Sequence, residues 1–184
     1  GVNSLNDGNH FIMADRIVAG TYVLAAVMRN KKFTVKNIKS KYLIALTNVL
    51  KEMNANLQID ENSITVFPTD EILGTNIETA PYPGFPTDLQ AQIMSLMSLA
   101  KGSSKIVEKI FENRFMHVAE LNRLGADIKI KNDTAFINGG RKFKGAQVMA
   151  SDLRASVSLI LAALCAEGET VVHRVYHLDR GYEK

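Results

Sequence analysis

The sequence predicts an inside-out α/β (α+β) barrel of repeated strand–helix–strand–helix–strand–strand (βαβαββ) units, with helices buried inside and sheets outside. Three observations support this fold class. Two helical segments, 88–101 and 152–167, are apolar on nearly every side, which is typical of buried helices. Short segments with strand character flank them. Similar segments also recur at spacings of 64 to 73 residues, which indicates an internal repeat.

The first unit is expected to contain two helices and three strands. Asp15 and Arg16 open a helix that continues to about Asn30, and a strand follows over Phe33–Asn37. Apolar residues at spacings of three and four predict a second helix from Ser40 to Met53. Two strands then follow, at 57–59 and 64–67, joined by a polar turn.

The second unit is expected to begin with a stiff loop, 79–86, that holds three of the chain's four prolines. Each proline fixes its own φ and restricts the residue before it. Thr87 and Asp88 follow as the expected N-cap of the helix 88–101. A strand through 106–110 ends this stretch. The remaining predicted elements are helix 117–124, strands 128–130 and 135–137, helix 152–167 and strand 170–175.

The repeat divides the chain into units 11–78, 79–145 and 146–184, about 2.6 repeats in a single domain over 1–184. Residues 50–66 align without gaps on residues 121–137, and Asp15, Asp88 and Asp152 begin equivalent helices. The third unit lacks counterparts of 115–137. The repeat therefore predicts that the chain is a piece of a longer polypeptide with a truncated third unit. The first unit lacks its opening strand unless the N-terminal segment supplies it.

Composition narrows the function classes. Hydrophobic residues make up 46% of the chain, which indicates a packed core. The net charge is +3 without a long basic run, so no nucleic-acid partner is expected. No apolar run approaches the roughly 20 residues that span a bilayer, so no membrane partner is expected. The single cysteine favours a reducing compartment, and we expect a cytoplasmic protein.

Charged residues at the ends of predicted elements are the candidates for chemistry. Asp88 either stabilises the helix dipole or acts on a substrate hydroxyl group. Asp152 and Arg154 form either a local ion pair or an anion site at a helix start. Arg114 and Arg180 end strands at corresponding places of the repeat, which suggests a shared anionic ligand.

Other reactive residue types do not form a recognisable site. Cys165 lies among apolar residues with no base or cation nearby, so we expect a core residue with a raised pKa. His, Cys and acidic residues do not occur at metal-ligand spacing, so no metal is expected. The glycines do not form a phosphate-binding loop.

Four motifs resemble the UDP-N-acetylglucosamine 1-carboxyvinyltransferase family of enolpyruvyl transferases: APYPGFPTDLQAQ, IFENRFMHVAEL, AQVMASDLRASVSLILA and VYHLDRGYE. The resemblance extends from Met13 to the end of the chain. It implies an enzyme of two similar domains, each with three βαβαββ units, that acts in the cleft between them. The implied reaction transfers the enolpyruvyl group of phosphoenolpyruvate to the 3-hydroxyl of UDP-N-acetylglucosamine and releases phosphate, the first committed step of peptidoglycan synthesis. It needs no metal or organic cofactor.

The resemblance also implies a role for each candidate residue. Asp88 resembles the carboxylate that contacts the sugar hydroxyl and is a candidate general base. Asp152 and Arg154 match a pair near the reacting carbons, and the Ile110 backbone matches a position that meets the nucleotide sugar. Arg114 and Arg180 resemble arginines that bind phosphoenolpyruvate or the intermediate. The expected catalytic residues are Asp88, Asp152 and Arg180.

One departure from the family pattern limits these expectations. The family's proton-donating cysteine loop is absent, because the chain resembles most of only one of the two domains. We therefore expect the chain alone to be inactive and to need the second domain of the same polypeptide as its partner. A 3-phosphoshikimate 1-carboxyvinyltransferase-type relative and a non-catalytic regulatory paralogue remain alternatives.

Overall fold

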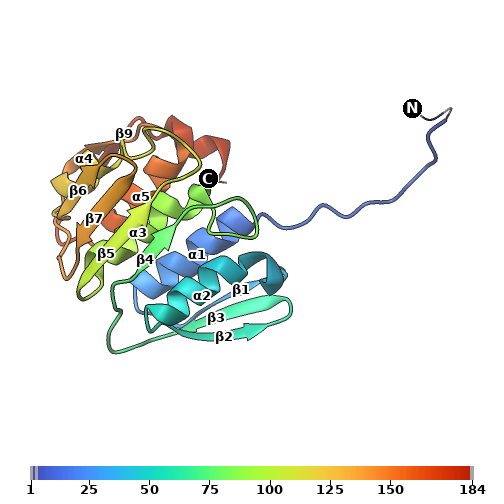
Figure 1. Ribbon diagram of the computed structural model, residues 1–184, viewed down its shortest axis with the longest axis horizontal. Coiled ribbons are helices and arrows are strands. Elements are labelled where there is room, and N and C mark those ends of the chain that lie inside the picture. The colour runs from blue at the N-terminus through green and yellow to red at the C-terminus, as the bar shows by residue number, and fades with distance from the viewer. Residues whose placement is uncertain (1, 3, 183–184) are drawn as a thin grey trace.

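Three sheets surround a group of inner helices (Figure 1). The computed structural model describes residue 2 and residues 4–182, except for the side chain of Arg180. The inner helices, which pack against one another, are α1 (Arg16–Met28), α3 (Gln90–Leu99) and α5 (Leu153–Ala163). The predicted fold class, with helices inside and sheets outside, is confirmed.

The inner helices are buried because they carry few charged side chains and many small ones. In α3, every residue from Gln90 to Ser98 is buried. Two of their polar side chains hydrogen-bond to neighbouring helices: Ser95 Oγ donates to the Ser158 carbonyl of α5 at 3.1 Å, and Gln92 Nε2 donates to Thr21 Oγ1 of α1 at 3.3 Å. Short side chains and these hydrogen bonds allow the helices to pack in the interior, although both polar side-chain atoms of Gln90 and Oε1 of Gln92 have no hydrogen-bond partner among the described residues.

The three sheets have corresponding strand orders but different numbers of strands: three, four and two. The first has the order β1-β3-β2 and is antiparallel, the second has the order β4-β5-β7-β6 with β4 parallel to β5, and the third pairs β8 and β9 in parallel. The strands are β1 (Phe33–Lys36), β2 (Asn56–Asp60), β3 (Ser63–Phe67), β4 (Asn76–Glu78), β5 (Ser103–Val107), β6 (Ile128–Lys131), β7 (Thr134–Asn138), β8 (Gln147–Met149) and β9 (Val171–His173).

Outer helices connect the strands of the first two units. They are α2 (Ile44–Glu52) and α4 (Val118–Arg123). Each is followed by a residue with positive φ, Asn54 at 66° and Gly125 at 104°, which are 71 residues apart. Strands β3 and β7, and likewise β4 and β8, also begin 71 residues apart. The aligned segments of sequence therefore have matching backbone conformations.

Several predicted elements differ from the observed ones. β4 and β8 were not predicted, because each has only three residues and depends on parallel pairing with a later strand. The strand expected over 170–175 ends at His173, because Arg174 adopts a left-handed conformation with φ of 61°. A 3₁₀ turn, Val175–Arg180, follows it; the other 3₁₀ turns are Ser40–Leu43 and Thr87–Leu89.

The segment before α1 extends away from the folded body (Figure 1). Residues 4–15 contain no helix or strand. Within the described residues, none of the helices is both long and apolar enough to cross a membrane.

Candidate active site

Asp88 lies where the proline loop enters the core. Hydrogen bonds from Ala80 N to Phe85 O (3.0 Å) and from Gly84 N to Pro81 O (2.8 Å) close the loop. The 3₁₀ turn Thr87–Leu89 follows, and the Leu89 side chain is fully buried. The buried neighbour fixes the turn, while the Asp88 side chain remains 41% exposed.

Asp88 does not cap a helix, so the predicted N-cap pair is wrong. Neither the Thr87 nor the Asp88 side chain accepts a hydrogen bond from a backbone N–H group at the start of α3. Thr87 instead donates its hydroxyl group to Glu108 Oε2 at 2.9 Å. The Asp88 carboxylate is therefore available for other groups.

Two arginines hold one oxygen of Asp88. Arg114 Nη2 donates to Asp88 Oδ1 at 2.9 Å, and Arg154 Nε lies 3.3 Å from the same oxygen. No group in the described part of the chain hydrogen-bonds the other oxygen, Oδ2. The structure thus brings together three candidates from distant parts of the sequence and leaves a carboxylate oxygen open to a hydroxyl donor.

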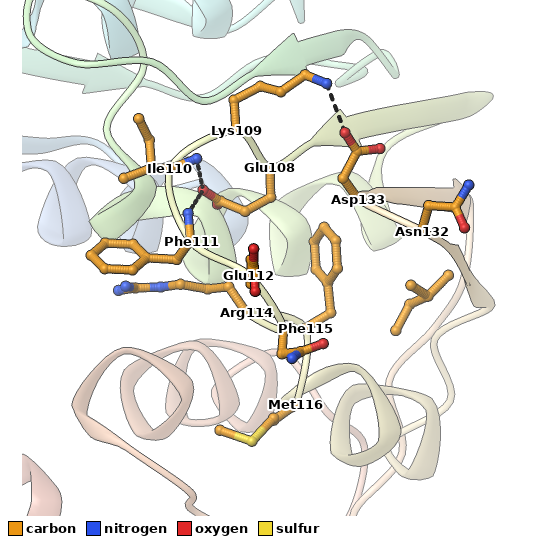
Figure 2. A pocket seen from close by; sticks show the side chains of 12 residues that line it. Glu108, Lys109, Ile110, Phe111, Glu112, Arg114, Phe115, Met116, Asn132 and Asp133 are labelled. Atoms are coloured by element: carbon orange, nitrogen blue, oxygen red, sulfur yellow. Dashed lines mark hydrogen bonds and ion pairs between the residues drawn. The ribbon is translucent and has the colours of Figure 1, made fainter.

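The sequence predicts that Arg114 ends a strand, but it lies in a loop. β5 ends at Val107, and the residues up to 116 leave the sheet as an irregular loop and turns. The Arg114 guanidinium carbon lies 4.7 Å from the centre of the Phe111 ring, and both side chains extend to the same side of the loop (Figure 2). This cation–π contact fixes the arginine beside Phe111, the residue that follows Ile110.

A cavity of about 790 Å³ lies between this loop and the β6–β7 turn (Figure 2). Its lining includes the loop residues from Glu108 to Met116 together with Ile130, Asn132 and Asp133. Asp88 and Arg154 do not line it. The cavity therefore adjoins the arginine–carboxylate group through Arg114 only.

Asp152 caps α5 and is close to a buried histidine. Asp152 Oδ1 accepts hydrogen bonds from the N–H groups of Arg154 (2.8 Å) and Ala155 (3.0 Å). His117 is 4% exposed, and burial lowers its pKa to about 4. The Asp152 charge opposes this shift and the Arg114 charge adds to it. A neutral imidazole therefore lies behind the site at neutral pH.

Sequence reasoning missed His117 and Glu108. The sequence pattern predicts His117 only as the first residue of a helix, although its position between Phe115 and Val118 in an apolar stretch indicates burial. Glu108 interrupts the β-branched stretch that continues β5, and it is also 4% exposed. A charged residue in a buried strand-like segment is the signal that could have identified it.

Arg180 can be placed only by its backbone. It ends the 3₁₀ turn Val175–Arg180 rather than a strand, which corrects the prediction. Its side chain lies outside the described part of the chain, so its predicted role stays a prediction.

Cys165 contacts the core, as predicted. It is half-buried, burial raises the pKa of its thiol, and Sγ donates to the Met28 carbonyl at 3.6 Å. Arg29 lies nearby, contrary to the expectation that no cation would. Among the residues that the structure describes, three or more His, Cys, Asp or Glu side chains do not gather in a group that could hold a metal ion.

Comparison with known proteins identifies the family. The model of the EPSP synthase (3-phosphoshikimate 1-carboxyvinyltransferase) family matches residues 1–184. The chain belongs to this family.

Curated members of the EPSP synthase family share about half of the residues. A protein of Pelagibacter ubique is 51% identical over the whole chain, which covers 44% of that protein's length. One of Aliarcobacter butzleri is 55% identical over 94% of the chain and 41% of its own length. Both are named UDP-N-acetylglucosamine 1-carboxyvinyltransferase. The chain thus spans less than half the length of these relatives.

Solved structures of the family share the fold. The enolpyruvyl transferase NikO from Streptomyces tendae superposes with a TM-score of 0.86 at 24% identity, over 93% of this chain and 41% of NikO. EPSP synthase from Acinetobacter baumannii gives a TM-score of 0.69 at 17% identity, over 96% of this chain and 44% of its own. At these identities the comparison supports the fold alone.

Proposed function

We propose that this chain forms one wall of an active site that transfers the enolpyruvyl group of phosphoenolpyruvate to the 3-hydroxyl group of UDP-N-acetylglucosamine. Relatives 49 to 55% identical to the chain carry the name of this activity. The observation that carries the proposal is the Asp88 carboxylate: Arg114 and Arg154 hold Oδ1, and no residue in the described part of the chain hydrogen-bonds Oδ2. That group suits a substrate hydroxyl beside anionic groups.

In this reaction the sugar oxygen bonds to C2 of phosphoenolpyruvate while C3 gains a proton, which gives a tetrahedral intermediate. Phosphate then leaves as C3 loses a proton and the double bond returns. In the proposal, Asp88 Oδ2 accepts the proton of the sugar hydroxyl group. The guanidinium groups of Arg114 and Arg154 orient Asp88 and favour the carboxylate and phosphate charges of the second substrate.

The remaining roles rest on the motifs. Asp152 is proposed to lie near the reacting carbons, the Ile110 backbone to meet the nucleotide sugar, and Arg180 to bind phosphoenolpyruvate or the intermediate. A second domain of the same polypeptide is proposed as the opposite wall, because the curated relatives are more than twice as long as the chain. On this proposal the chain alone releases no phosphate.

The test is phosphate release by the full-length product of the gene that encodes this chain. We expect release that requires both phosphoenolpyruvate and UDP-N-acetylglucosamine, and a loss of turnover of at least about 100-fold in Asp88→Asn, because the base is removed. Asp60→Asn is the matched control: Asp60 lies in the β2–β3 hairpin, and among the described side chains its carboxylate hydrogen-bonds only Gln58 and Ser63, so turnover should not change.

Two results would reject the proposal. No release from the folded parent protein would favour the non-catalytic paralogue. Phosphate release that requires shikimate 3-phosphate instead of the nucleotide sugar would favour a 3-phosphoshikimate 1-carboxyvinyltransferase.

A further inference from the structure

Glu108 is a buried carboxyl group that forms no ion pair with any residue that the structure describes. It follows the last residue of β5 and is 4% exposed. Burying such a group is costly unless hydrogen bonds replace its hydration. Its partners therefore indicate what the residue does.

Four donors surround this carboxyl group. Oε1 accepts from Thr79 Oγ1 at 2.8 Å, Ile110 N at 2.9 Å and Phe111 N at 3.2 Å, while Oε2 accepts from Thr87 Oγ1 at 2.9 Å. Thr79 Oγ1 also accepts from Lys109 N at 2.9 Å, so its hydrogen is directed to Glu108. Hydrogen-bond donors thus satisfy both oxygens.

The donors come from the two loops that carry the candidate site. Thr79 and Thr87 flank the proline loop, and Thr87 directly precedes Asp88. The other two are the backbone N–H groups of the loop that leads to Arg114. One side chain therefore connects the segment that carries the carboxylate to the segment that carries its arginine partner.

Glu108 also sets the direction of two peptide groups (Figure 2). The N–H groups of Ile110 and Phe111 are turned towards it. In a trans peptide the carbonyl points opposite to the N–H, so the carbonyl groups of Lys109 and Ile110 point away from Glu108. Within residues 4–182, neither carbonyl oxygen accepts a hydrogen bond.

We propose that Glu108 is a positioning residue for the nucleotide sugar. It does not touch the substrate; it holds the Asp88 turn and the Ile110 backbone in one arrangement. This inference rests on the proposed function. Loss of the carboxyl group frees both loops, and displacement of reacting groups by about 1 Å can cost about 100-fold in rate.

The experiment compares kinetics of the full-length protein with substitutions at Glu108. For Glu108→Ala we expect kcat/KM for UDP-N-acetylglucosamine to fall about 100-fold. Glu108→Gln should recover it to within about fivefold, because the amide oxygen keeps the three donors of Oε1 and the Thr87 hydroxyl can rotate to accept. Thr87→Val, which removes one hydroxyl group, should lower kcat with no change in the folded fraction.

The control is Asn122→Ala, which removes two side-chain hydrogen bonds elsewhere, at an exposed residue. The Asn122 side chain bonds Ile128 N at 3.0 Å and Ile128 O at 2.9 Å, between α4 and β6. It should lower stability and leave kcat/KM per folded molecule unchanged. Unchanged kcat/KM per folded molecule in both Glu108→Ala and Thr87→Val would overturn the inference while parent turnover still supports the proposed function. An inactive parent would instead reject the function itself.

Discussion

Asp88 and Asp152 precede corresponding inner helices, α3 and α5, but their carboxylates have different partners. Asp152 accepts two backbone N–H groups, a capping arrangement worth about 1 kcal/mol. Asp88 binds two arginine side chains in a partly exposed place, where an ion pair contributes at most about 1 kcal/mol to stability. The arrangement at Asp88 therefore suits ligand binding better than stabilisation of the fold.

His117 predicts a pH dependence of stability. Its folded pKa of about 4 lies below the ordinary value of 6.5, because burial disfavours the imidazolium. Between these values the unfolded chain binds the proton and the folded chain does not, so stability falls as pH decreases through this window. The free energy of unfolding should lose about 2 kcal/mol from this group between pH 7.5 and pH 5.

The measurement is urea unfolding of the parent and of His117→Gln at both pH values. Glutamine does not titrate, so the variant should lose about 2 kcal/mol less than the parent over the same interval. Equal losses in the two proteins would show that His117 does not titrate in this way. The comparison removes the contributions of the other histidines.

At the level of the elements, glycines occur where the backbone of one unit approaches the backbone of the next too closely for a Cβ atom. A Cβ atom on Gly74 would lie 2.5 Å from Ser103 O, and one on Gly145 would lie 2.1 Å from Glu169 O. The two glycines are 71 residues apart, so the same close approach recurs in the repeat. It places each opening strand, β4 or β8, beside its parallel partner.

Gly145→Ala should destabilise the chain, because backbone atoms must move to admit the methyl group. We expect a loss of about 1–3 kcal/mol, the usual cost of overpacking. Urea unfolding would measure it, with Gly8→Ala as the control, since no atom lies within 4 Å of a Cβ there. A free energy of unfolding equal to that of the control would show that the close approach is not constraining.

The same elements explain which parts of the fold could be predicted. The long helices and the β2–β3 and β6–β7 hairpins have periodic or turn-bounded patterns, and they were predicted at nearly the observed positions. β4 and β8 have no such pattern, since three residues cannot establish a period. The loop after Val107 was mistaken for strand because Ile110 is β-branched, whereas the Glu108 carboxyl group turns that backbone away.

At the scale of the whole molecule, the sequence indicates which helices are buried but not which side chains contact one another. The apolar composition of α3 and α5 predicted that both lie inside. The contact between Asp88 and Arg154 depends on how those helices align their first turns, which local pattern does not contain. The candidate site residues could therefore be named from the sequence. Their geometry, and the hydrogen bonds by which Glu108 connects the two loops, are visible only in the folded structure.

The packing of α1, α3 and α5 against one another predicts that the units unfold together. Leu96 of α3 is 1% exposed, so Leu96→Ala should cost about 2–5 kcal/mol, whereas Ile44→Ala, at a site 53% exposed, should cost less than about 1 kcal/mol. Hydrogen exchange should show amides of β3 and β7 losing protection by the same amount in Leu96→Ala, because both sheets lie on the shared core. If β3 kept the protection of the parent while β7 lost it, the units would be energetically separate, and the inner helices would not form one cooperative core.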